Sequence, residues 1–413
     1  MAAPPDGVEI RVPGGRSITN RALVAAALAD GRSVLRGAGL SDDSEAMIDC
    51  LRTLGAEITV DGTDVTVEGV AGRPTGDVEV FTRLSGTTSR FVTAVAALAD
   101  GPVRIDAAEP MRKRPMGDLV DALRALGVTV DEQGEPGHLP LVVTGPIGGD
   151  EVTVPGDISS QYISGLLLAA GGRPDVEGFT IHVGGERLVS APYTSMTVHV
   201  MEAFGQLVAV TSQFDVVGSG YLPTEYDVEA DAATAGYVLT AAAITGGTVT
   251  VPGLPTADLQ ADVELVDVLE QMGCTVVWEG RDVTVTGGPL HGGTFDLTAF
   301  SDMAPTVAVL GAFADGPVEV TGVGFIRGKE TDRIAASVAE LRRIGVDATE
   351  TDDGFIVRPG ATPHGAVIET YDDHRMAMSF ALVGLVVPGI SVADPGVVAK
   401  THPGFWDDLE RLR

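Results

Sequence analysis

The sequence predicts an α/β protein of two domains. The chain has 413 residues, which is more than one hydrophobic core usually serves. An Ala-rich helical stretch followed by a glycine and a β-rich run recurs about every 70 residues. Between these copies, β-branched residues alternate with polar ones in the period-two pattern of half-buried strands. Together, length, repeat and periodicity favour α/β layers over an all-helical or all-β fold.

The repeat is marked by a glycine after each Ala-rich helix. Four copies are clear, as in AAALADGRSV at 25–34 and VAALADGPV at 95–103. Two weaker copies fall where the spacing demands them. Six copies in a chain of two domains predict three repeats in each domain. The six glycines are Gly31, Gly101, Gly178, Gly247, Gly316 and Gly389.

A second helix and a strand pair follow in most repeats. The helix ends at a glycine placed as a C′ residue would be, in the segments 51–55, 123–127, 269–273 and 341–345. Alternating strands follow, joined by turns such as Asp61-Gly62 and Asp353-Gly354. Each repeat is therefore predicted to run β-α-β-α-β-β. We expect a break near residues 221–224 and a ligand site in a cleft between the domains.

Charge and composition limit the class of partner. The formal net charge of −31 argues against nucleic acid and anionic membranes. No apolar run is long enough to span a membrane and the N-terminus has no signal pattern, so we expect a cytoplasmic protein. The two cysteines lie in amphipathic segments and the histidines lack metal-ligand spacing, which predicts free thiols and no metal site.

The stretch at residues 13–21 is the first candidate binding site. Two glycines precede a predicted helix at residues 18–29, and Ser17 occupies the expected N-cap position. Arg16 and Arg21 place fixed cations at the same helix start. A helix N-terminus with two guanidinium groups can bind phosphate or carboxylate. An ordinary capped helix with two surface arginines explains this stretch equally well when it is taken alone.

Similar chemistry recurs at other predicted helix starts and, in the stretch 400–403, near the end of the chain. A plain cap or a surface ion pair would explain each stretch singly, but their shared position in the repeat favours one site for two anionic ligands. Asp302 and Glu330 would then be the available proton carriers. No P-loop or dinucleotide-binding spacing occurs. The polar stretches are 85–90, 111–115, 157–161, 328–333, 372–376 and 400–403.

These stretches resemble those of the 5-enolpyruvylshikimate-3-phosphate synthase family over essentially the whole chain. The matching segments are PGGRSITNRAL at 13–23, SGTTSRF at 85–91, RKRPMGDLVDALRALG at 112–127, ISSQYISGLLL at 158–168, LVSAPY at 188–193, GKETDR at 328–333, YDDHRMAMSFALVGL at 371–385, and DPG with KT-P at 394–403. The resemblance implies an inside-out α/β barrel of two domains that close on substrate. We expect residues 14–225 in one domain, and residues 1–13 with 226–413 in the other.

The resemblance also implies roles for single residues. Phosphorylated shikimate would be held by Ser17, Arg21, Ser159, Ser160, Gln161, Ser190 and Lys329. Phosphoenolpyruvate would be held by Gly86, Arg114, Arg333, Arg375 and Lys400. Asp302 would take the proton from the 5-hydroxyl, and Glu330 would handle protons at the enolpyruvyl methylene. No cofactor and no metal are implied, and we expect a monomer that acts on small anionic molecules.

One catalytic position departs from the family pattern. The family carries lysine where this chain has Arg16, and arginine keeps the charge but does not shuttle protons at neutral pH. This leaves a second hypothesis, a diverged paralogue that acts by elimination on a shikimate-like or cyclitol phosphate. A UDP-N-acetylglucosamine enolpyruvyl transferase would need a reactive loop cysteine, which neither Cys50 nor Cys274 matches. A non-catalytic anion-binding protein would not need both Asp302 and Glu330.

Overall fold

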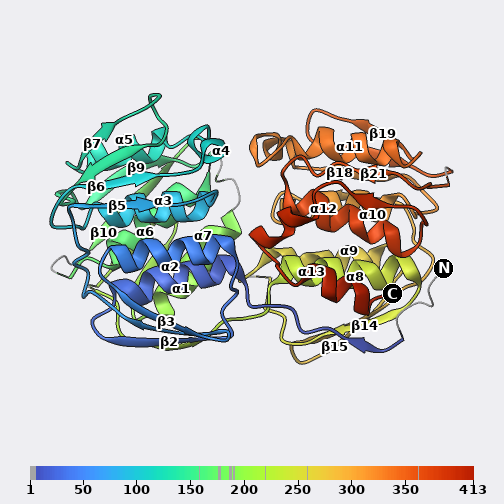
Figure 1. The fold of residues 1–413 in the computed structure, drawn as a ribbon, viewed down its shortest axis with the longest axis horizontal. Helices are drawn as coiled ribbons and strands as arrows, with labels where there is room; N and C mark the ends of the chain where they lie inside the picture. Colours follow the sequence, from blue (N-terminus) through green and yellow to red (C-terminus); the bar gives the residue numbers. More distant parts are fainter. Residues whose placement is uncertain are drawn as a thin grey trace. The chain divides into compact units, whose positions relative to one another are not determined.

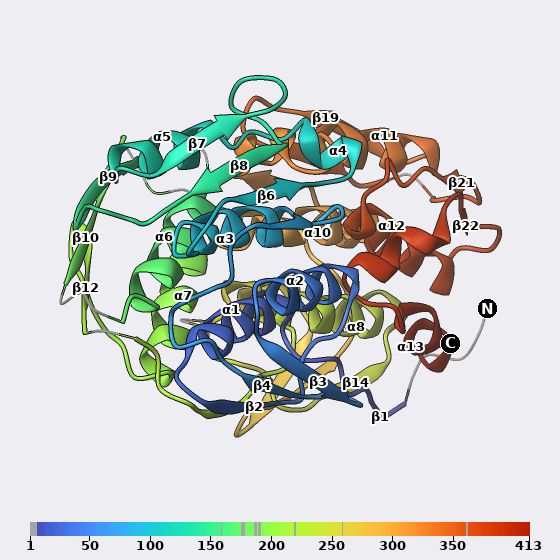
Figure 2. The same cartoon turned by 60° about the vertical axis from the view of Figure 1, so that its left-hand side comes forward.

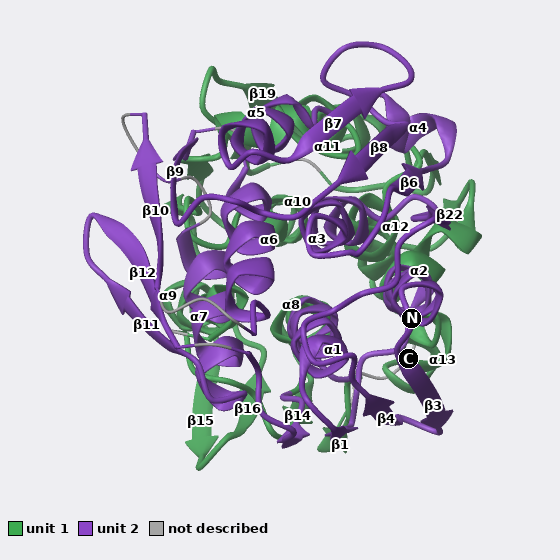
Figure 3. Cartoon of the chain, turned by 90° about the vertical axis from the view of Figure 1, so that its left-hand side faces the viewer, with its two compact units in different colours: residues 1–13, 230–413 green, residues 14–229 purple. Residues whose placement is uncertain are grey.

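The computed structural model divides the chain into two compact units, each with its own core. It describes residues 6–157, 159–174, 178–185, 188, 191–218, 220–257, 259–360 and 362–413. Unit 1 comprises residues 1–13 and 230–413, and unit 2 comprises residues 14–229. Figure 3 gives each unit its own colour. The division falls at 229/230 rather than at the expected 225/226, because a short strand at 225–227 pairs with a strand near residue 34.

Unit 2 contains three four-stranded sheets of the same topology. In each, two strands run parallel and the remaining pairs are antiparallel. The first has the order β13 (Glu225–Asp227), β2 (Arg32–Arg36), β4 (Asp64–Glu68), β3 (Glu57–Asp61). The second has the order β5 (Val78–Phe81), β6 (Val103–Asp106), β8 (Leu141–Thr144), β7 (Thr129–Glu132). The third has the order β9 (Glu151–Pro155), β10 (Phe179–Gly184), β12 (Gln213–Val217), β11 (Leu207–Val210).

Helices fill the interior of unit 2, and the sheets lie outside them (Figure 2). The inner helices α1 (Arg16–Leu28) and α6 (Ser160–Gly171) are buried on nearly all sides, so they have no solvent-facing side. Small residues let them approach closely: a Cβ on Gly165 would lie 3.0 Å from the backbone oxygen of Arg90. The helices are α1 (Arg16–Leu28), α2 (Asp42–Thr53), α3 (Gly86–Ala96), α4 (Glu109–Arg112), α5 (Gly117–Ala125), α6 (Ser160–Gly171) and α7 (Ala191–Ala203).

Unit 1 repeats this plan with a shortened third repeat. Its first sheet has the order β1 (Val8–Glu9), β14 (Thr248–Val251), β16 (Asp282–Thr286), β15 (Thr275–Glu279). Its second has the order β17 (Gly293–Asp296), β18 (Val318–Thr321), β20 (Phe355–Arg358), β19 (Asp347–Glu350). Among the described residues of the third repeat, the strands are the parallel pair β21 (Val367–Ile368) and β22 (Ser391–Val392). A 3₁₀ turn and a helix follow β22 where the other repeats have a second helix and a hairpin.

The helices of unit 1 form one core with the inner faces of these sheets (Figure 1). They are α8 (Ala232–Thr245), α9 (Leu265–Gln271), α10 (Ala304–Gly311), α11 (Arg333–Arg343), α12 (His374–Ala381) and α13 (Phe405–Arg411). The 3₁₀ turns are η1 (Ala261–Glu264), η2 (Ser301–Met303), η3 (Gly324–Gly328), η4 (Leu382–Leu385) and η5 (Pro395–Lys400).

The glycines that were expected to end the second helices behave as predicted. Gly55, Gly127, Gly273 and Gly345 all have positive φ, as a C′ residue in the left-handed conformation requires. The two-domain α/β fold and its repeats are therefore confirmed.

Among the described residues, no helix is both long and apolar enough to cross a membrane, and no cluster of three possible metal ligands occurs.

Candidate functional site

The start of α1 carries the first group of candidate residues. The helix begins at Arg16, two residues before the predicted start, and its N-cap is Gly15. The prediction that Ser17 caps this helix is therefore wrong. Ser17 is the second helical residue, and its backbone oxygen accepts a hydrogen bond from Arg21. Gly15 fits the cap position because its own N–H donates to Glu229 O at 2.7 Å.

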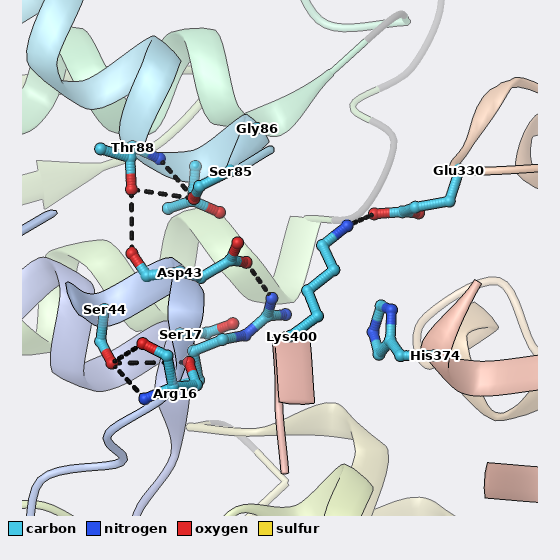
Figure 4. Close-up of polar contacts among 12 residues, drawn as sticks. Arg16, Ser17, Asp43, Ser44, Ser85, Gly86, Thr88, Glu330, His374 and Lys400 are labelled. Carbon is cyan, nitrogen blue, oxygen red and sulfur yellow. Dashed lines mark hydrogen bonds and ion pairs between the residues drawn. The ribbon is translucent and has the colours of Figure 1, made fainter. Parts of the chain in front are cut away.

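Arg16 is held by a carboxylate from the next helix. Its guanidinium forms an ion pair with Asp43 on α2, as Figure 4 shows. The Asp43 side chain is 2% exposed, and its backbone oxygen accepts a hydrogen bond from Thr88 on α3. Thr88 is bonded in turn to the cap residue Ser85. The starts of α1, α2 and α3 are thus joined by one polar chain.

Arg21 is a buried cation with neutral hydrogen-bond partners. Its Nε donates to Thr197 Oγ1 at 2.7 Å, and its two terminal nitrogens donate to backbone oxygens of Ser17 and Tyr193. Burial lowers the pKa of Arg21 to about 9, and the neighbouring Arg16 adds to this. Within the described part of the chain, no carboxylate is bonded to Arg21. An anion at this position would supply the missing counter-charge.

The start of α3 brings two further arginines together. A Cβ on Gly86 would lie 2.5 Å from Arg90 Nη1 and 2.8 Å from Arg114 Nη1, so only glycine leaves both guanidinium groups in place. Arg90 is buried and donates to Gly86 O and to Gln161 Oε1, both at 3.2 Å. Gln161 also donates to Thr87 Oγ1. The start of α6 is therefore tied to the start of α3.

Three serines were expected beside these arginines. Ser159 is the N-cap of α6, and its hydroxyl accepts a hydrogen bond from the backbone N–H of Gln161. Ser160 is the first residue of that helix and is buried. Ser190 lies outside the described residues. The starts of α1, α3 and α6 thus carry cations and hydroxyl groups suited to phosphate and carboxylate oxygens.

Unit 1 holds the two candidate proton carriers. Asp302 in η2 accepts hydrogen bonds from Arg333 at 2.8 Å and from Arg375 at 2.6 Å. Burial alone would raise the pKa of Asp302, but the cations of Arg375 and Arg333 outweigh it and hold that pKa far below its ordinary value. Asp302 is therefore ionised at neutral pH, and its carboxylate does not serve as a helix cap.

Arg333 connects the carboxylates of unit 1. Its buried guanidinium donates to Asp302, to Glu330 at 2.9 Å and to Asp373 at 2.7 Å. Glu330 also accepts a hydrogen bond from Lys400 Nζ at 2.7 Å, as drawn in Figure 4. A single guanidinium thus bridges the two candidate proton carriers.

The remaining candidates of unit 1 surround this group. Arg375 donates to Tyr237 OH at 3.1 Å, and Lys329 lies 5.7 Å from the centre of the Phe325 ring. His374 is fully buried near Lys400 (Figure 4). Burial, with Lys400 and Arg375, lowers the pKa of His374 well below its ordinary value, so the imidazole is neutral. Neither ring nitrogen has a hydrogen-bond partner among the described residues.

A second buried carboxyl group lies near Asp302. Asp262 in η1 has a pKa raised to about 7, mainly by burial and then by the negative charge of Asp302. Its Oδ1 has no hydrogen-bond partner in the described part of the chain. Two carboxyl groups in one environment thus have opposite pKa shifts, a pattern common where protons are transferred.

Comparison with known proteins identifies the family. The family model described as EPSP synthase (3-phosphoshikimate 1-carboxyvinyltransferase) matches residues 7–409. A 3-phosphoshikimate 1-carboxyvinyltransferase of Nostoc sp. is 42% identical, over 97% of this chain and 96% of the relative. The chain belongs to the EPSP synthase family. A chloroplastic enzyme of the same name from Nicotiana tabacum is 39% identical, over 97% of this chain and 82% of its own.

Solved structures agree with the assignment to the EPSP synthase family. An EPSP synthase from Acinetobacter baumannii is 25% identical with a TM-score of 0.84, over 100% of this chain and 96% of that one. The enolpyruvyl transferase NikO from Streptomyces tendae has a TM-score of 0.76 at 18% identity, over 100% of this chain and 95% of that one, which shows a shared fold alone.

Several polar residues that contact the candidate residues of unit 2 and unit 1 were not predicted as site residues. Asp373 and His374 lie in the segment 371–385 that resembles the family, and Arg90 is the last residue of the polar stretch 85–90. Their closeness in sequence to predicted site residues could have identified them. Asp43, Tyr237 and Asp262 had no such signal. Their positions in the sequence are those of ordinary helical residues, and only tertiary packing places them against Arg16, Arg375 and Asp302.

Proposed function

We propose that this protein transfers the enolpyruvyl group of phosphoenolpyruvate to the 5-hydroxyl of shikimate-3-phosphate and releases phosphate. The name shared by its close relatives supports this proposal. The observation that carries it is the bridge formed by Arg333 between Asp302 and Glu330. It holds two carboxylates next to each other beside cations that fit an anionic substrate.

The reaction is an addition followed by an elimination. The 5-hydroxyl oxygen attacks C2 of phosphoenolpyruvate, Asp302 takes the hydroxyl proton, and Glu330 in its protonated form delivers a proton to C3. The C2–O bond to phosphate then breaks, Glu330 takes a proton back from the methyl carbon to restore the methylene group, and the proton on Asp302 passes to the departing phosphate. Asp302 is a weak base while Arg333 and Arg375 hold it. An incoming carboxylate or phosphate that binds those arginines would raise its pKa toward the working range.

We assign each candidate binding residue to one of the two substrates. Phosphoenolpyruvate would bind Gly86 and Arg114 of unit 2 and Arg333, Arg375 and Lys400 of unit 1. Shikimate-3-phosphate would bind Lys329 and the unit 2 residues Ser17, Arg21, Ser159, Ser160, Gln161 and Ser190. Arg16, in the place of the family lysine, would supply charge but no proton. We further propose a monomer that works in the cytoplasm.

An assay with defined substrates tests the proposal. Purified protein is mixed with shikimate-3-phosphate and phosphoenolpyruvate, and phosphate release is measured together with the enol ether product. Equal amounts of both products support the transfer. Phosphate released from shikimate-3-phosphate without phosphoenolpyruvate would instead show the eliminating paralogue that Arg16 leaves open. A parallel reaction with UDP-N-acetylglucosamine in place of shikimate-3-phosphate should give no product.

A further inference from the structure

The segment that precedes Arg375 has a strained backbone. Asp373 N donates to Thr370 O at 2.9 Å, which closes a four-residue turn. Both central residues of this turn have positive φ, 54° at Tyr371 and 56° at Asp372. Such turns ordinarily contain glycine, asparagine or aspartate, so a tyrosine at the first central position is unusual. Strain of this kind persists only where the surrounding structure holds it.

A single buried carboxylate on α11 holds this turn. Glu340 is fully buried, and its Oε1 accepts a hydrogen bond from Tyr371 OH at 2.6 Å. Its Oε2 accepts another from the backbone N–H of Glu369 at 3.1 Å. Glu340 therefore holds the start of the turn through one side chain, that of Tyr371, and one backbone N–H, that of Glu369.

The same face of α11 also holds the far end of the turn. Arg333 lies seven residues before Glu340, which places the two side chains on one side of the helix. Arg333 bonds the carboxylate of Asp373, the N-cap of α12. Asp373 in turn accepts from the backbone N–H of Arg375 at 2.8 Å. The turn is thus fixed at its start by Glu340 and at its end by Arg333.

The second repeat contains an equivalent arrangement. Arg83 has φ 52° and lies two residues before Ser85, the N-cap of α3, as Tyr371 lies two residues before Asp373. Its guanidinium is bonded to Asp42 at 2.6 Å and to Asp49 at 2.7 Å. Both carboxylates belong to α2, the second helix of the preceding repeat, as Glu340 belongs to α11. In both units, a left-handed residue bonded to a carboxylate of the preceding helix thus comes just before a candidate ligand-binding helix start.

We propose that Glu340 is a positioning residue that sets the place of Arg375 through the turn at 370–373. It touches no substrate and acts by fixing Tyr371 and Glu369, which fixes the start of α12. The proposal rests on the proposed function, in which Arg375 binds phosphoenolpyruvate. Loss of the Glu340 contact should let the turn relax and move the Arg375 guanidinium from the substrate.

Steady-state kinetics distinguishes positioning from a simple loss of folded protein. In Glu340→Ala, KM for phosphoenolpyruvate should rise about tenfold or more, with KM for shikimate-3-phosphate changed less than about twofold. Glu340→Gln, which keeps an oxygen acceptor, should fall between Glu340→Ala and the unchanged protein. Arg342→Ala is the matched control on α11: it removes an exposed guanidinium that donates to Ala348 O, so both KM values should stay unchanged.

The milder variant Tyr371→Phe covers the case in which Glu340→Ala does not fold. It removes only the hydroxyl bonded to Glu340 and should raise KM for phosphoenolpyruvate in the same direction. A fall in kcat that matches the folded fraction, with unchanged KM values in Glu340→Gln and Tyr371→Phe, would overturn the proposal.

Amide hydrogen exchange separates this proposal from the proposed function. Exchange at residues 369–376 should quicken in Tyr371→Phe, while exchange in the rest of α11 stays as in the unchanged protein. That result supports the positioning role of Glu340 even if the unchanged protein makes no enol ether. The absence of enol ether would refute only the proposed function. Unchanged exchange at these residues would refute the positioning role of Glu340.

Discussion

Arg16 and Asp43, separated by 27 positions in the chain, form an ion pair between the starts of α1 and α2. Arg16 keeps 17% of its side-chain surface exposed, whereas Asp43 is almost completely buried. The buried partner therefore fixes the direction in which the guanidinium points. This explains how a longer and bulkier side chain can stand in the place of the family lysine.

This relationship predicts the effect of restoring the lysine. Arg16→Lys keeps a cation beside Asp43 and should keep or raise enolpyruvyl transfer. Arg16→Gln removes the charge, leaves Asp43 without this counter-ion, and should lower kcat/KM at least about tenfold. Phosphate release with both substrates is the measurement. An equally low rate in Arg16→Lys and Arg16→Gln would show that the guanidinium shape, rather than its charge, is required.

Loss of the Asp302 carboxylate should have a larger effect. Asp302→Ala should lower kcat at least about 100-fold, because no group remains to take the hydroxyl proton. Asp296→Ala is a control at the exposed end of β17, where the carboxylate accepts from Thr298, and should keep the original rate. Thermal melting of both variants checks that they fold. Full activity in folded Asp302→Ala would contradict the assignment of Asp302 as the base.

A methyl group at Gly86 should weaken phosphoenolpyruvate binding. The added Cβ would lie at 2.5 Å and 2.8 Å from the heads of Arg90 and Arg114, which must move away. Because the nearest atoms are the ends of side chains and not backbone, Gly86→Ala should fold and raise KM for phosphoenolpyruvate about tenfold. Gly148→Ala is a control for the general effect of replacing a glycine, because a Cβ there meets Leu126 O at an ordinary 3.6 Å. Equal KM values for phosphoenolpyruvate in Gly86→Ala and Gly148→Ala would contradict the role of Gly86.

The raised pKa of Asp262 predicts a pH-dependent stability. Its pKa is about 7 in the folded protein against an ordinary 3.8, under the influence of burial, Asp302, Arg375 and Asp231. Between about pH 4 and pH 7 the folded state binds a proton that the unfolded state has lost, so this contribution to stability falls as pH rises. Asp262→Asn removes the effect.

Thermal melting at two pH values measures this contribution. The melting temperature of Asp262→Asn relative to the unchanged protein should therefore be higher at about pH 8 than at about pH 5. Asp267→Asn, at an exposed position, is the control. Its melting temperature relative to the unchanged protein should be the same at both pH values. A constant difference for Asp262→Asn would show that Asp262 stays ionised.

The fold could be predicted because its signals are local. The helix-ending glycines and the alternating strands each concern neighbouring residues, and Gly31, Gly101 and Gly316 mark places where the same local pattern recurs. The helix starts that carry Arg21 and Arg375 were found in the same way. The cap of α1 was misplaced because Gly15 and Ser17 both suit an N-cap, and a bond from Gly15 N–H to distant Glu229 O favours the former.

The sequence by itself determined the repeated α/β architecture, the family, and which cations and carboxylates are available for chemistry. Only the tertiary structure decided that Asp43 holds Arg16, that Arg333 bridges Asp302 and Glu330, and that Glu340 holds Tyr371. The physical reason is range. Periodicity and caps arise from contacts within a few residues, whereas the Arg16–Asp43, Asp302–Arg333 and Glu340–Tyr371 pairs join residues 27 to 31 positions apart.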